Sequence, residues 1–134
     1  MNNQIINDKL NALNKSKFRS SFHLTKDMIE YIQSKGMQVI VKHAYDFVKQ
    51  KLVRLLDNDG KQTPMKGHPV FIAMHACGCC CRGCIEKWHH ISKDKILTDN
   101  EVNYIVSILI EWIRRNYKQR KDKHESHNNK TTLC

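Results

Sequence analysis

The sequence predicts a mainly α-helical protein, a single small domain of about five helices around a Cys/His metal site. Its 134 residues suffice for one hydrophobic core but not for two independent ones. Two long segments, residues 37–56 and 97–116, repeat apolar residues at the spacing of one helix face. Five of the six cysteines and four of the eight histidines fall between residues 68 and 90. Such a concentration of soft ligands indicates a metal site.

The N-terminal part begins with residues 1–15, which are rich in Asn and Lys with scattered Ile and Leu. We predict a flexible arm there, with one frayed helix as the alternative. The first firm helix covers residues 25–36, because Thr25 or Asp27 can cap its start and Gly36 supplies a left-handed stop.

The central part holds the helix over residues 37–56 and a polar loop over residues 57–67. The many hydrogen-bond donors of this loop would bind a ligand if the loop lies beside the site. Pro69 suits the first turn of a short buried helix. A strand over residues 70–74, where apolar residues alternate, is the alternative.

The C-terminal part starts with the helix over residues 97–116, which has Thr98 as cap and Glu101 three residues later. From residue 114 to the end the chain has seven basic and two acidic residues and almost nothing apolar. The predicted organisation is therefore an N-terminal arm (1–15), a metal-binding helical domain (16–116) and a basic disordered tail (117–134).

The overall charge is strongly basic, with 23 Lys and Arg against 13 Asp and Glu and a formal net charge of +10. A basic surface favours DNA or RNA as a partner through counterion release, although solubility alone would also explain it. No apolar stretch is long enough to span a membrane, and the polar start has no secretory core. We therefore expect a cytoplasmic protein without membrane association, in which clustered cysteines bind metal or act in catalysis rather than form disulfides.

The metal site centres on the motif CRGC, whose two cysteines have the spacing of a zinc knuckle. Gly83 eases the tight turn, and a helix that starts near Cys84 would favour a thiolate there. The sequence offers more donors than a tetrahedral ion needs. The predicted ligands are Cys80, Cys81, Cys84, His89 and His75.

The expected metal is zinc, which suits mixed sulfur and nitrogen ligands. The three neighbouring cysteines would also suit an iron-sulfur cluster whose fourth position is open or filled by His. Buried apolar cysteines without any metal are a further alternative.

The run NDGKQTPMKGHPVFIAMHACGCCCRGCIEKWHHI, with KHAYDFV before it and YIVSILIEWI after it, resembles a small bacterial and phage family known as domain of unknown function 4186. The resemblance covers residues 16 to about 116 and implies no activity. In the family pattern the positions of Cys77 and Cys79 are threonine-like, whereas Cys80, Cys81, Arg82, Cys84, Trp88 and His89 match. The resemblance therefore implies that Cys77 and Cys79 are dispensable.

The first function class that the sequence favours is a metal-binding protein, with zinc as the expected metal, associated with nucleic acid through its basic surface and tail. The second is a metal-dependent hydrolase or nuclease. Its candidate catalytic residues are His43 and Asp46, three apart on one helix, and His68 after the polar loop. An iron-sulfur or redox-sensing protein is the third class. The sequence does not decide between enzyme and binding module.

Overall fold

The computed structural model describes the backbone of residues 3–133 and the side chains of residues 3–120. Within that range the chain is mainly helical and contains no strand. The fold class is therefore confirmed, with six α-helices in the described residues where about five helices were predicted. The helices are α1 (Asn3–Asn14), the 3-10 helix η1 (Arg19–Ser21), α2 (Lys26–Lys35), α3 (Met37–Lys51), α4 (Pro69–Ala76), α5 (Arg82–His89) and α6 (Asp99–Leu133).

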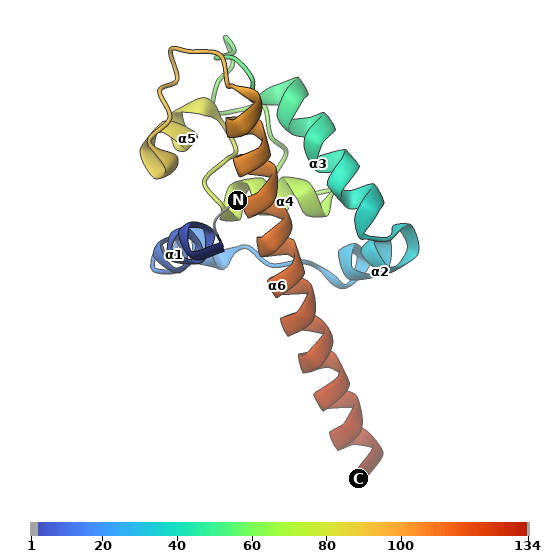
Figure 1. Cartoon of the computed structure of the whole chain (residues 1–134). Coiled ribbons are helices and arrows are strands. Elements are labelled where there is room, and N and C mark those ends of the chain that lie inside the picture. The colour runs from blue at the N-terminus through green and yellow to red at the C-terminus, as the bar shows by residue number, and fades with distance from the viewer. Residues whose placement is uncertain (1–2, 134) are drawn as a thin grey trace.

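The long helix α6 is the centre of the architecture, and α1, α3 and α4 all pack against its N-terminal half (Figure 1). In that view α1 and α5 lie on one side of α6, and α2 and α3 lie on the other. Apolar side chains of α6 form the middle of the core. They are Val102, Ile105, Val106, Ile108, Leu109 and Ile113.

The predicted helix ends are largely those of the structure. Thr25 Oγ1 accepts a hydrogen bond from Met28 N at 3.2 Å, and Gly36 ends α2 with φ of 84°. Thr98 and Glu101 form a reciprocal capping box at the start of α6, with distances of 2.8 and 3.1 Å.

Helix α3 ends at Lys51, five residues before the sequence predicts. The carbonyls of Leu52 and Val53 accept hydrogen bonds from the Arg82 guanidinium, and the Val53 carbonyl also accepts one from Leu97 N. These donors, which are distant in the sequence, satisfy the carbonyl groups that follow α3, so no further helical turn is needed there.

The segment for which we predict a flexible arm contains α1. Ile6, Leu10 and Leu13 are spaced for one helix face and are buried in the core. Lys9 Nζ also donates to the carbonyl of Trp88 at 2.7 Å. At the other end, α6 continues to Leu133, through the predicted tail, and residue 134 lies outside the described residues. The proposed division into arm, domain and tail stays a prediction.

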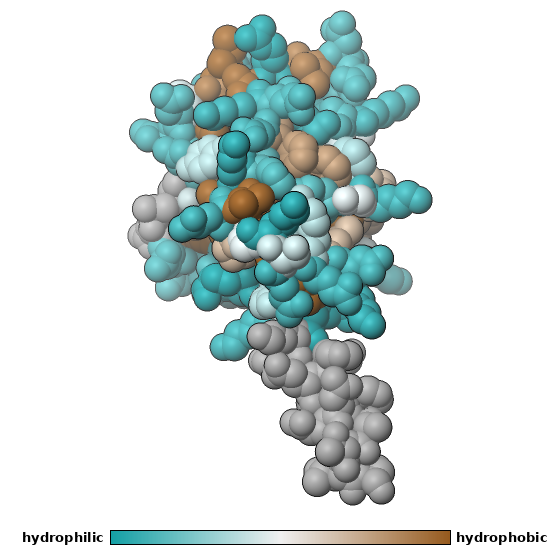
Figure 2. All heavy atoms as spheres, turned by 90° about the vertical axis from the view of Figure 1, so that its right-hand side faces the viewer, coloured by the Kyte–Doolittle hydropathy of each residue, from teal (hydrophilic) through white to brown (hydrophobic). Residues whose placement is uncertain are grey.

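The surface over α2 and α3 is mostly hydrophilic, with small separate hydrophobic areas (Figure 2). Among residues 3–133, no helix combines the length and the apolar character needed to cross a bilayer.

Candidate metal centre

The sulfur atoms of Cys80, Cys81 and Cys84 converge where the loop after α4 enters α5. All three lie within 4.8 Å of one another. Four sulfurs around one zinc ion at about 2.3 Å are about 3.8 Å apart, so small side-chain rotations would bring these three onto one ion. Cys81 is the N-cap of α5, and its Sγ accepts a hydrogen bond from Cys84 N at 3.4 Å. The three cysteines are therefore close enough to hold one metal ion.

The polar loop over residues 57–67 holds this turn in place. The Asp59 carboxylate accepts hydrogen bonds from Arg82 N at 2.9 Å and from Gly83 N at 3.0 Å. Gln62 Nε2 donates to the same carboxylate at 2.9 Å, and Thr63 Oγ1 donates to the Cys80 carbonyl at 2.7 Å. Burial opposes ionisation of Asp59, but these donors lower its pKa. The loop thus serves the site by fixing its backbone.

Arg82, inside the CRGC motif, faces away from the sulfurs and is fully buried. Its guanidinium donates to the carbonyls of Leu52 at 3.3 Å, Val53 at 3.0 Å and Ser92 at 2.6 Å. The motif is therefore anchored on one side to the end of α3 and on the other to the segment after α5.

Arg19, in η1, is the site residue that the sequence reasoning missed. Its side chain is only 8% exposed, and it donates to Cys84 Sγ at 3.2 Å and to Cys80 Sγ at 3.6 Å. A third bond, 2.7 Å long, goes to the carbonyl of His75. Burial would lower the pKa of Arg19, but the contacts with Cys80 and Cys84 raise it. No local pattern signals this role, because the contacts join residues 61 and 65 positions apart.

The thiols do not ionise equally in the absence of a metal. The hydrogen bond from Cys84, against the effect of burial and with the help of Arg19, lowers the pKa of Cys80 to about 7. The same bond, together with burial, raises the pKa of Cys84. Burial raises the pKa of Cys81. These contacts therefore favour ionisation of Cys80, whereas the helix start favours a thiolate at Cys84.

The two histidines predicted as ligands lie outside the group of three sulfurs. His89 has Nδ1 2.7 Å from Tyr104 Oη and Nε2 2.8 Å from the Cys77 carbonyl. A ring nitrogen that faces a carbonyl must carry the proton, and it then has no lone pair for a metal. Burial lowers the pKa of His89 to about 4.

His75 is held in the same way, with Nε2 3.1 Å from the carbonyls of both Thr63 and Pro64. Its Nε2 is therefore also a donor. Coordination by His75 or His89 stays a prediction; His75 would have to use Nδ1, and His89 would have to break one of its hydrogen bonds.

Cys77 and Cys79 are completely buried in the core. Burial raises the pKa of both thiols, so they remain protonated. Neither belongs to the group of three sulfurs, and their dispensability stays a prediction.

Of the candidate catalytic residues, the structure brings His43 and His68 together. His68 is the N-cap of α4, with Nδ1 accepting from Val70 N at 3.0 Å, and its Nε2 lies 3.0 Å from His43 Nδ1. Nε2 of neutral His68 must therefore carry the proton and donate to His43. Burial, followed by repulsion from His43, lowers the pKa of His68 to about 4.

Asp46 is exposed and does not take part in this pair, because His43 is oriented by His68. The pair sits at the N-terminal end of α4, whereas the cysteines follow its C-terminal end, about 12 Å away along the helix axis. The histidine pair is therefore separate from the metal centre.

A comparison with protein families finds one that matches most of the chain. The family described as "Domain of unknown function (DUF4186)" matches residues 7–114. The match confirms the resemblance and extends it into α1. No solved structure matches the chain.

Proposed function

The chain belongs to the DUF4186 family, and from its site we propose that it binds one zinc ion through Cys80, Cys81 and Cys84. The observation that carries the proposal is the convergence of the three sulfurs within 4.8 Å on a turn braced by Asp59. In a reducing compartment such a group is more stable as a metal-thiolate site than as three adjacent thiols.

Charge balance supports this proposal. A buried guanidinium needs an anionic partner, and among the described side chains the only ionisable groups to which Arg19 donates are the thiols of Cys80 and Cys84. Three thiolates around Zn²⁺ carry a net charge of −1, which the charge of Arg19 neutralises. Arg19 thus balances the charge of the metal-loaded state, as it also balances that of a lone Cys80 thiolate.

The fourth coordination position is open in this proposal, because no fourth donor belongs to the group within the described side chains. Water or an exogenous ligand would fill it. The same open set of three cysteines fits an iron-sulfur cluster with one exposed iron, which remains the alternative.

We further propose that the metal stabilises a scaffold that associates with DNA or RNA. Support comes from the net charge of +10 and from the exposed lysines of α2 and α3, such as Lys26, Lys35, Lys42 and Lys49. The test is binding to duplex DNA and to RNA at several salt concentrations. Affinity should fall steeply as salt increases, and affinity without a salt slope, or no binding at low salt, would end this part of the proposal.

The metal proposal is tested by elemental analysis and visible absorption of protein purified without added metal. We expect one zinc per chain and no visible colour, whereas a brown protein containing iron would favour the cluster. The Cys81→Ser variant should lose the metal. Its matched control, Cys79→Ser, removes a buried sulfur from the same loop and should retain it.

A further inference from the structure

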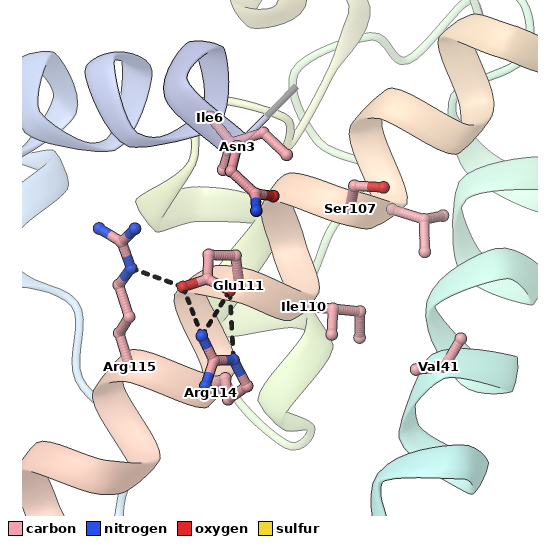
Figure 3. Close-up of a pocket in the computed structure, with 9 residues that line it drawn as sticks. Asn3, Ile6, Val41, Ser107, Ile110, Glu111, Arg114 and Arg115 are labelled. Atoms are coloured by element: carbon pink, nitrogen blue, oxygen red, sulfur yellow. Dashed lines mark hydrogen bonds and ion pairs between the residues drawn. The ribbon is translucent and has the colours of Figure 1, made fainter. Parts of the chain in front are cut away.

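The larger of two pockets beside α1 and α6 has arginines that already contact a carboxylate. It has a volume of about 480 Å³ and lies between α1, α3 and α6 (Figure 3). Its two arginines face the carboxylate of Glu111, with Arg114 Nη2 at 3.0 Å and Arg115 Nε at 2.7 Å. The two guanidinium groups that line this pocket therefore already have a carboxylate partner.

The second pocket, of about 170 Å³, lies where α1, η1 and α6 meet. Arg19 and Asn116 belong to its buried floor, and Phe22 and Trp112 give it apolar, half-buried walls. Arg115 and Gln119 stand at its exposed rim. Its lining contains two arginines and no Asp or Glu.

Arg19 and Asn116, the two buried polar side chains of this lining, each keep one hydrogen-bond donor free. Arg19 uses Nη1 and Nη2 for the sulfurs and the His75 carbonyl, and Asn116 uses Oδ1 to accept from Leu24 N at 2.8 Å. Among the described residues, neither Arg19 Nε nor Asn116 Nδ2 has a partner, and neither is sealed from solvent. Donors that line a pocket and still touch solvent are available to a ligand.

The charges around the pocket favour an anion. Arg114 and Arg115 share the single carboxylate of Glu111, so that group of three keeps a net charge of +1. The Arg19 charge is shared with the thiols of Cys80 and Cys84 and the Arg115 charge with Glu111, so the pocket offers an anion hydrogen-bond donors and no acidic lining residue.

We propose that this pocket binds a small oxyanion, a carboxylate or a phosphate, on Arg19 Nε and Asn116 Nδ2, with any apolar portion of the ligand against Phe22 and Trp112. The volume admits a headgroup with a short substituent. Arg19 Nε belongs to the same guanidinium whose Nη1 and Nη2 contact Cys80 and Cys84, so a bound oxyanion is one side chain away from the metal centre. The proposal does not require the metal.

The test is NMR titration of the ¹⁵N-labelled full chain with inorganic phosphate in one arm and benzoate in the other, and with chloride as the ionic-strength control. The two tryptophans provide the readout, because Trp112 lines the pocket and Trp88 does not. We expect the Trp112 indole signal to shift saturably with a Kd below about 10 mM, while the Trp88 signal stays in place. The arm that saturates identifies the class of oxyanion.

Two matched variants test the location. Gln119→Glu places a carboxylate at the rim, and at a distance of about 7 Å in water it should weaken binding about three-fold at low salt. Gln33→Glu makes the same change on the exposed surface of α2, away from the pocket, and should leave the Kd unchanged.

Equal weakening by both variants, shifts that do not saturate, or no shift with either anion would overturn the proposal. Metal content measured on the same samples tests the zinc proposal separately. Failure of the oxyanion proposal is therefore distinguishable from failure of the zinc proposal.

Discussion

Replacement of Arg19 by methionine tests how far the buried guanidinium stabilises a metal-thiolate group. The guanidinium nitrogens lie 3.2 and 3.6 Å from the sulfurs, and a zinc ion would add about 2.3 Å, so the charges are separated by about 5 Å. With an effective dielectric constant of about 20, a single positive charge at that distance stabilises a group of charge −1 by about 3 kcal/mol. Arg19→Met should therefore weaken zinc binding about 100-fold.

The assay is competition for zinc against a chromophoric chelator, with circular dichroism to verify that the variant is folded. Arg19→Lys keeps the charge and should lose less affinity than Arg19→Met. Arg114→Met removes an equal charge from an exposed ion pair and should have little effect. If a folded Arg19→Met chain binds zinc within about three-fold of the wild type, the charge argument fails.

Two further predictions concern stability. Because burial lowers the pKa of His68 and of His89 from 6.5 to about 4, the free energy of unfolding should decrease as pH falls through that window, by at most about 3 kcal/mol for each histidine. Urea unfolding at several pH values measures this slope, which should be smaller in His68→Asn, a variant that keeps a side-chain cap on α4; an identical slope would contradict the assignment. At Gly78, with φ of 67°, an added Cβ would lie 2.7 Å from the Trp88 ring, so Gly78→Ala should cost about 2 kcal/mol or more. Gly60→Ala meets no atom within 4 Å and should lower the thermal midpoint less; the reverse order would refute the packing argument.

The helices could be predicted from the sequence because their signals are local. Apolar periodicity placed α3 and α6, and the caps Thr25 and Thr98 lie within three residues of the amides that they bind. Helix α1 was harder to predict, because its stability comes from packing of its three apolar residues against the core, which the local sequence does not show.

The candidate site likewise contains residues that local spacing identifies and residues that only the fold brings together. Spacing alone indicated Cys81 and Cys84, and Cys80 followed from its position next to them. The choice of His75 and His89 rested on proximity in sequence, whereas the direction of each ring is set by carbonyls of the backbone. Arg19 was missed because only the folded chain brings it to the sulfurs.

X-ray absorption at the zinc edge of protein purified without added metal tests the central claim most directly. Coordination by Cys80, Cys81 and Cys84 predicts three sulfur neighbours at about 2.3 Å and one lighter atom. A fourth sulfur neighbour, a shell made mainly of nitrogen and oxygen, or a zinc-free protein would contradict it.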